Sequence, residues 1–131
     1  MYLLDTNTLI YLFREVGNVR ARMAAQPDST LHLCTINLFE LEYGFAKSSN
    51  AAVQRALLGD LTSRLQVLPF DANSAQLAGH AKAHLQKAGT PIGPYDLLIA
   101  AIALAHNLTV VTRNVREFSR VPGLRVENWY D

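Results

Sequence analysis

The sequence predicts an α/β protein, a three-layer α/β/α sandwich with a mostly parallel central sheet. Short apolar runs begin near residues 2, 31, 66 and 109, and longer amphipathic or apolar segments separate them. This alternation is typical of parallel strands joined by crossover helices. The chain has 131 residues, half of them hydrophobic, and contains no linker or repeat. We therefore expect residues 1–131 to form a single domain with a substantial core.

The first predicted strand and helix meet at an aspartate. Residues 2–4 are apolar, Asp5 follows them, and apolar periodicity resumes between Thr8 and Phe13. This pattern predicts a buried strand that passes straight into a helix. At the carboxyl end of a parallel strand, Asp5 would stand where ligands bind. A carboxylate at this position can also simply cap the helix, so both interpretations stay open at this stage.

The second predicted strand covers residues 31–34, and Thr35 is placed to cap a helix that continues to about Ser48. The apolar stripe of this helix is expected to face the core and contains Leu38, Leu41 and Phe45.

Two acids on this helix are expected to point in different directions. Glu40 shares a face with Ile36 and Gly44, because helical residues four apart lie on one side, whereas Glu42 should face solvent. A glycine inside a helix is about 1 kcal/mol less favourable than alanine, which suggests that another group approaches Gly44 closely. Glu40 is therefore a candidate for a cleft, beside the alternative of an ordinary surface glutamate.

The middle of the chain predicts two helices around a strand at residues 66–69. Asp71 should cap the second helix and Gly89 should end it. His80 and His84 lie four apart on that helix, but no glutamate follows the first histidine and no third ligand is in view, so a zinc site is not expected. The helix before the strand covers residues 51–64, and its expected buried face contains Val53, Ala56, Leu57, Leu61 and Leu65.

An apolar helix is predicted after Pro94, which suits the first helical position. The segment is apolar all round, as expected of a buried helix. Asp96 then falls in its first turn, where the helix dipole and free backbone amides favour an ionised carboxylate. The fourth strand follows at residues 109–112. Beyond it, Asn114 to Glu117 resembles a capping box, and a last short strand is expected at residues 124–126.

Composition excludes several classes of protein. The longest apolar stretch, Leu97 to Ala105, has nine residues, too few to span a bilayer. No basic leader with an apolar segment precedes Tyr2, and the single cysteine, Cys34, excludes an internal disulfide. We therefore expect a cytoplasmic protein without a membrane partner.

Four segments, taken in order, resemble a PIN domain and, more narrowly, the VapC toxins of bacterial type II toxin–antitoxin pairs. They are residues 3–7, 40–44, 91–101 and 111–118. The resemblance implies a metal-dependent endoribonuclease that cleaves structured RNA, often a transfer RNA, and is neutralised by a cognate VapB-like antitoxin. It also implies a homodimer, to which the apolar helix surface of the chain is suited.

The same resemblance assigns site residues. Asp5, Glu40 and Asp96 fall on the acidic metal-site positions of the family, and Asn114 stands at a fourth catalytic position that is often aspartate in PIN domains. Setting the three acids aside leaves 8 acidic residues against 12 basic ones, a surface excess that suits a polyanionic partner such as RNA.

The implied chemistry is hydrolysis assisted by Mg²⁺, with Mn²⁺ as a substitute. Hard divalent ions take oxygen ligands and keep several waters, and they lower the pKa of bound water and neutralise charge at the scissile phosphate. Attack by water would leave a 5′-phosphate and a 3′-hydroxyl. Thr6, Asn7 and Thr112 are expected to orient the ligands, and Arg113 and Arg116 to hold the RNA backbone.

Other families that carry an aspartate after the first strand fit the sequence less well. A haloacid-dehalogenase-like phosphatase requires a second acid two residues later, where this chain has Asn7. A receiver domain requires an acidic pair at the end of the first strand and a lysine late in the chain. The remaining alternative is a non-catalytic PIN-like module that binds RNA or protein, and Asn114 keeps that alternative open.

Overall fold

The computed structural model describes residues 1–131 and contains one sheet of five parallel strands, in the order β3-β2-β1-β4-β5. The strands start where the apolar runs start, so the predicted α/β/α fold and its parallel sheet are confirmed. They are β1 (Tyr2–Leu4), β2 (Leu31–Cys34), β3 (Gln66–Leu68), β4 (Thr109–Val111) and β5 (Arg125–Glu127).

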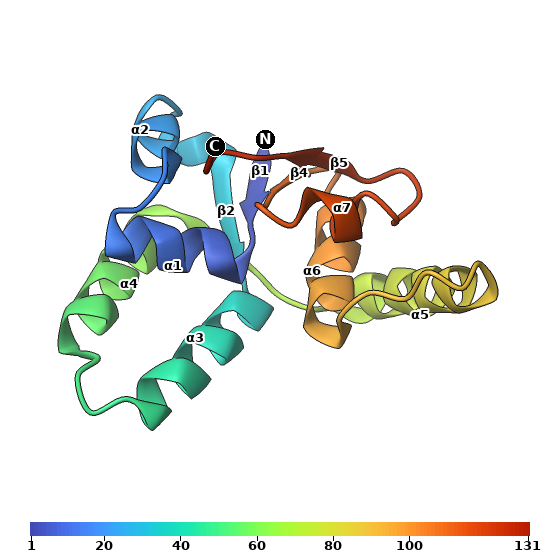
Figure 1. Ribbon diagram of the computed structural model, residues 1–131, viewed down its shortest axis with the longest axis horizontal. Coiled ribbons are helices and arrows are strands. Elements are labelled where there is room, and N and C mark those ends of the chain that lie inside the picture. Colours follow the sequence, from blue (N-terminus) through green and yellow to red (C-terminus); the bar gives the residue numbers. More distant parts are fainter.

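Helices cover both faces of the sheet (Figure 1). One face is covered by α1 (Thr6–Arg14), α2 (Val19–Ala24), α3 (Thr35–Lys47) and α4 (Ala52–Arg64). The other face is covered by α5 (Ala72–Lys87), α6 (Pro94–Ala105) and α7 (Val115–Phe118). A short 3₁₀ turn, Asp28–Thr30, precedes β2. None of these helices combines the length and the apolar character that crossing a membrane requires.

Strands β1 to β4 each contribute to two hydrophobic clusters, one on each face of the sheet. Leu3 packs with the cluster beneath α5 and α6, whereas its neighbour Leu4 packs with the cluster beneath α1 to α4. Val110 and Val111 divide in the same way. Because both faces are buried, the strands read as continuous apolar runs instead of alternating ones.

Most of the predicted helix ends are confirmed. The Asp71 carboxylate accepts a hydrogen bond from the Ser74 amide at 2.9 Å, Gly89 has a φ of +70° just beyond α5, and Pro94 is the first residue of α6. The predicted Thr35 cap is wrong, because the N-cap of α3 is Cys34. The Thr35 hydroxyl instead accepts a hydrogen bond from the Phe70 amide and ties α3 to the chain after β3.

Two further expectations are wrong, the first of them in part. Leu61 and Leu65 are buried as predicted, but Val53 is 66% and Leu57 39% exposed, and Ala56 is exposed as well. The reason is geometric, because Val53 and Leu57 border an open groove between α4 and α1. At Gly44, a β-carbon in place of the glycine hydrogen would meet no atom within 4 Å, so no other part of the chain approaches it closely.

The sheet order creates a switch point beside β1. The chain leaves β1 toward β2 and β3, and later returns to place β4 and β5 on the other side. In open parallel sheets, such a reversal opens a crevice at the carboxyl ends of the two central strands, and this crevice is the usual place for a ligand. Here those ends are Asp5 after β1 and Thr112 after β4.

Candidate active site

Asp5 stands at this switch point, whose surroundings at the strand ends we call the crevice, and is only 3% exposed. One carboxylate oxygen, Oδ1, accepts a hydrogen bond from the Thr8 amide at 2.7 Å, and Oδ2 accepts one from the Thr112 hydroxyl at 2.5 Å. Asp5 therefore caps α1 and also stands at the strand end, and its role in binding a ligand stays a prediction. Burial raises the pKa of Asp5 above its ordinary value, although its hydrogen bonds act in the opposite direction.

Thr112 is the centre of the first of two relays, a term we use for a hydroxyl that accepts one hydrogen bond and donates another to an acid. Its side chain is fully buried and accepts a hydrogen bond from the Asn114 amide at 2.9 Å while it donates to Asp5. The predicted role of Thr112 in orienting a ligand is consistent with this contact.

Glu40 extends from α3 into the crevice and belongs to the second relay. Its Oε1 accepts a hydrogen bond from the Thr6 hydroxyl at 2.7 Å, and Thr6 in turn accepts one from the Asn37 side-chain amide at 3.0 Å. Glu42 faces solvent and pairs with Arg55, as predicted. Asn37 is fully buried and was not singled out from the sequence. The available signal was an amide in an otherwise apolar stretch, one turn before Glu40.

Asp96 sits in the first turn of α6, as predicted, but its carboxylate is not stabilised as expected. Burial, followed by the charges of Glu117, Asp5 and Glu40, raises its pKa to about 7. These contributions oppose the favourable end of the α6 dipole. The three other carboxylates are therefore close enough to repel that of Asp96.

Glu117 is a carboxylate of this crevice that sequence reasoning assigned to another role. It does not complete a capping box, since its Oε2 accepts a hydrogen bond from the Asn114 side chain at 2.9 Å and its Oε1 accepts one from the Gly93 amide. The hydrogen bond from Asn114, followed by that from Gly93, lowers the pKa of Glu117. Asn114 therefore holds an acid in place, and its own catalytic role stays a prediction.

The donor set fits a hydrated divalent cation. All the groups that converge are oxygen donors, which suits Mg²⁺ or Mn²⁺ better than softer metals. No three acidic, histidine or cysteine side chains stand close enough together to form a ready-made cage. An ion that keeps most of its waters does not need such a cage, and a cation would relieve the repulsion that raises the pKa of Asp96.

The other residues predicted to contact RNA or to orient ligands differ in how far their side chains are already engaged. Asn7 and Arg116 are exposed. The Arg113 guanidinium lies 3.7 Å from the centroid of the Tyr130 ring and 3.9 Å from the Asp131 carboxylate. Arg113 is therefore engaged with the last residues of the chain, and an RNA contact would require it to leave them.

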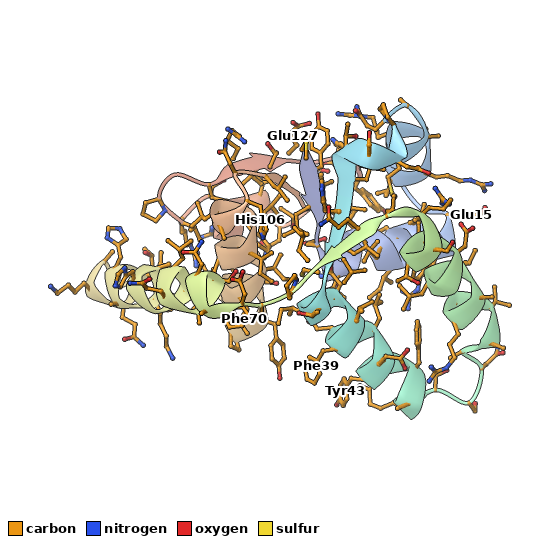
Figure 2. All side chains as sticks on the ribbon, turned by 180° about the vertical axis from the view of Figure 1, so that it is seen from behind. Glu15, Phe39, Tyr43, Phe70, His106 and Glu127 are labelled. Carbon is orange, nitrogen blue, oxygen red and sulfur yellow. The ribbon has the colours of Figure 1, made fainter.

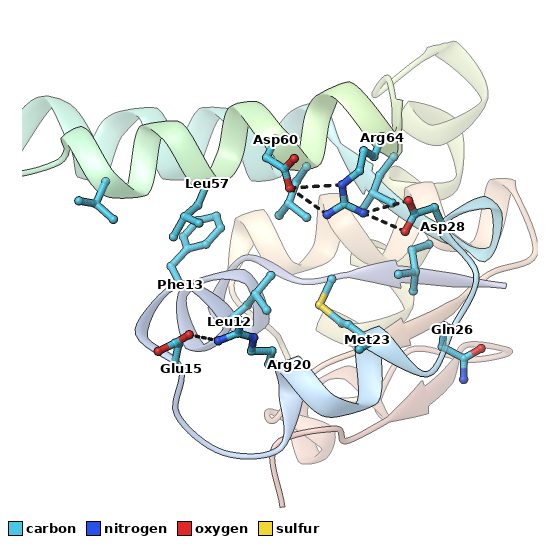
Figure 3. Close-up of a pocket in the computed structure, with 15 residues that line it drawn as sticks. Leu12, Phe13, Glu15, Arg20, Met23, Gln26, Asp28, Leu57, Asp60 and Arg64 are labelled. Atoms are coloured by element: carbon cyan, nitrogen blue, oxygen red, sulfur yellow. Dashed lines mark hydrogen bonds and ion pairs between the residues drawn. The ribbon is translucent and has the colours of Figure 1, made fainter.

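Two hollows lie on the α1 side of the molecule. The larger, which we call the groove, has a volume of about 650 Å³ and is bordered by α1, α2 and α4 (Figure 3). Its apolar lining includes Phe13, Met23 and Leu57, and Arg64 bridges Asp28 and Asp60 at its rim. A second hollow, the side pocket, measures about 220 Å³ and is lined by Phe13, Glu40, Gly44 and Gln54, among others. Phe13 thus borders both hollows, and Glu40 borders both the side pocket and the crevice.

A doubly wound parallel sheet with an acidic crevice at its switch point is the architecture of a class of nucleases. Residues 2–124 match the family model of the PIN domain. The chain belongs to the PIN-domain family and, within it, groups with the VapC ribonucleases.

Its relatives match over nearly their whole length. The chain is 40% identical over 129 residues to the tRNA(fMet)-specific endonuclease VapC of Salmonella typhimurium strain LT2, covering 98% of this chain and 97% of that protein. It is 36% identical over 132 residues to ribonuclease VapC2 of Rickettsia felis, covering 98% of both. The crystal structure of VapBC2 from Rickettsia felis, bound to a DNA fragment from their promoter, contains a chain that superimposes with a TM-score of 0.89 at 35% identity, with 98% of each chain covered.

Proposed function

We propose that this protein is a divalent-metal-dependent endoribonuclease toxin that hydrolyses phosphodiester bonds in RNA and is neutralised by a cognate antitoxin. The observation that carries the proposal is the convergence of Asp5, Glu40, Asp96 and Glu117 at the sheet switch point, where burial and mutual repulsion raise the pKa of Asp96 to about 7. Kinship with named ribonucleases supports the reaction class.

The roles of the residues follow from their surroundings. Bound Mg²⁺ or Mn²⁺ would supply charge neutralisation at the phosphate and a more acidic water. Asp5, whose two oxygens are fixed by Thr8 and Thr112, and Asp96 would hold the ion. Glu40 and Glu117, each oriented by a neighbouring polar side chain, would orient its waters.

The rim of the crevice suits an RNA backbone. Arg116, two residues after Asn114 in the sequence, is exposed, and so is Asn7 in the first turn of α1. A guanidinium near the acids can hold the phosphates that flank the cleaved bond. Because a similar protein is named for its action on tRNA(fMet), a transfer RNA is the proposed substrate.

The antitoxin is proposed to occupy the groove and then to reach the crevice. The groove is apolar, unfilled by the protein's own chain and suited to an amphipathic helix. The side pocket shares Phe13 with the groove and is lined by Glu40, so we propose that an extended segment of the antitoxin passes through it toward the acids. A VapBC complex among the similar structures supports a partner of this kind.

A second copy of the chain is proposed to cover the exposed aromatic face of α3. Phe39 and Tyr43 project from this helix into solvent (Figure 2), and Phe39 contacts the exposed Tyr95 ring edge-to-face with the centroids 5.2 Å apart. Patches of exposed aromatic side chains commonly mark protein interfaces. Light scattering at micromolar concentration tests this homodimer, and a 14.5 kDa species would overturn it.

The activity is tested with the purified protein and a mixed pool of transfer RNAs. We expect cleavage in Mg²⁺ or Mn²⁺, loss of cleavage in EDTA, and 5′-phosphate ends at the cut site, which sequencing of the product ends would locate. If RNA is bound but never cut under any of these conditions, the protein is instead the non-catalytic binding module. The variant Leu57→Lys supplies a test of the groove, since it should weaken antitoxin binding and leave cleavage intact.

A further inference from the structure

The buried amide of Asn37 has both of its ends engaged. Its Oδ1 accepts a hydrogen bond from the Cys34 backbone amide at 2.9 Å, and its Nδ2 donates to the Thr6 hydroxyl at 3.0 Å. The side chain is 0% exposed, so water does not compete for either contact. An amide buried this completely has a single orientation.

That orientation fixes the direction of every proton in the relay. A backbone N–H can only donate, so the atom that faces Cys34 must be the carbonyl oxygen, and the NH₂ group must face Thr6. Because Thr6 Oγ1 accepts from Asn37, its only hydrogen is directed to Glu40 Oε1, 2.7 Å away. Glu40 Oε1 is therefore an acceptor, which leaves Oε2 available to another ligand.

We infer that Asn37 is a positioning residue of the acidic site. It acts through the Thr6 hydroxyl to hold Glu40 with one oxygen occupied and the other presented to the cation or its waters. The inference rests on the proposed metal-dependent function and extends it to a residue that touches neither metal nor RNA. Side chains that orient ligands in this way commonly change metal affinity by about 10- to 100-fold when they are replaced.

The relay through Thr112 to Asp5 can be compared with the relay through Thr6 to Glu40. There the hydroxyl of Thr112 is set by the backbone amide of Asn114, which no ordinary side-chain substitution removes. The Glu40 relay is set by a side chain, so it can be interrupted without touching an acid.

Two variants interrupt the relay at different points. Asn37→Leu keeps the approximate shape and removes both polar groups, and Thr6→Val keeps the shape and removes the hydroxyl. Thr6→Ser restores the hydroxyl and should rescue the effect. Thr109→Val is the matched control, because Thr109 is 8% exposed like Thr6 but lies at the start of β4, away from the acids.

The measurement is Mn²⁺ affinity by calorimetry, together with the Mn²⁺ concentration that gives half-maximal cleavage and the rate at saturating Mn²⁺. We expect Asn37→Leu and Thr6→Val each to weaken Mn²⁺ binding about 10- to 100-fold, with Thr6→Ser and Thr109→Val near the parent. The double variant should bind Mn²⁺ no more weakly than Thr6→Val alone, because both substitutions remove the same contact.

Each other outcome has a distinct meaning. Parent-like Mn²⁺ affinity in Asn37→Leu, or effects of Asn37→Leu and Thr6→Val that multiply, would overturn the positioning role. If Asn37→Leu does not fold, as judged by its thermal melt in EDTA, then parent-like affinity in Thr6→Val overturns the relay by itself. A parent protein that binds Mn²⁺ without cutting RNA would remove the proposed function, while the affinities would still decide the role of Asn37.

Discussion

Asp5 and Asp96 face the same crevice, yet the protein surrounds them in opposite ways. Both oxygens of Asp5 accept hydrogen bonds, from the Thr8 amide and from the Thr112 hydroxyl, and the side chain is almost completely buried. Asp96 is only partly buried, and this burial, followed by the charges of three neighbouring carboxylates, raises its pKa to about 7. Hydrogen bonds fix the orientation of the first acid, whereas burial and repulsion disfavour the ionised form of the second.

In the metal site that we propose, this difference would prepare ion binding without a complete cage. The fixed carboxylate of Asp5 would define the position of the ion, since its oxygens are held by their donors. The carboxylate of Asp96 would favour binding, because a cation offsets its repulsion from neighbouring acids. The following predictions test this division, beginning with the largest expected effect.

Asp5→Asn should abolish cleavage, with a loss of at least about 100-fold, because even residues that only orient ligands reach that size. The metal-free variant should be as stable as the parent, or slightly more so, near neutral pH. Asparagine can still cap α1, and the pKa of Asp5 is raised by burial, so its ionised form opposes folding. Thermal melts with and without Mg²⁺, run beside a cleavage assay, measure both effects.

In the same melts, Mg²⁺ should stabilise Asp5→Asn less than it stabilises the parent, since ligand binding to the native state supplies that gain. Metal-dependent cleavage by this variant at the parental rate would contradict the assignment of Asp5 as a ligand.

Glu117→Gln should weaken Mn²⁺ binding by about 10-fold, the lower end of the range for groups that orient ligands. The glutamine keeps an oxygen for the Asn114 amide but removes the largest of the three charges that raise the pKa of Asp96. The pKa of Asp96 should fall as a result. Calorimetry and an NMR titration of the Asp96 carboxyl carbon measure the two changes, and an unchanged pKa would show that Glu117 does not poise this acid.

Metal-free protein should lose stability as the pH rises from about 4 to about 8. The folded-state pKa of Asp96, about 7, lies above its ordinary value of 3.8, so its contribution is fully present below the ordinary value and is lost as the pH rises through 7. The raised pKa of Asp5 acts in the same direction. Urea unfolding in EDTA should show a shallower decline of stability with pH for Asp96→Asn, whereas a parent that gains stability over this window would contradict the raised pKa values of these acids.

Glu42→Gln should have almost no effect, although Glu42 is only two residues from Glu40. Its carboxylate pairs with Arg55 at 2.8 Å on an exposed surface, and such pairs contribute about 0.2–1 kcal/mol. Cleavage and Mn²⁺ affinity should remain at the parental level. This variant is therefore the charge-matched control for the acids of the crevice, and a large loss of activity would mean that the acidic site extends around α3.

The sequence predicted the parallel sheet because strands buried on both faces leave uninterrupted apolar runs, and it predicted Asp5 and Asp96 because each stands at a recognisable element end. Asn37 and Glu117 were missed for a different reason. Their roles depend on Thr6 and Gly93, partners 31 and 24 residues away, and local patterns carry no information about such contacts.

The exposed face of α4 illustrates the same limit in packing. Val53 and Leu57 are apolar and lie at helical spacing, so the pattern predicts burial. They border the groove instead. A hydrophobic stripe shows that a surface must be covered, but it does not distinguish cover by the same chain from cover by another.

The central position of β1 in the sheet also determines when, during synthesis of the chain, the acidic site can fold. Strand β1 is synthesised long before its partner β4, and one of the hydrogen bonds to Asp5 comes from Thr112, 107 residues later. Contacts so distant in sequence form slowly, and a growing chain offers its amino-terminal part long before the remainder exists. The acids therefore cannot assemble on a partly synthesised chain that lacks β4 and α6.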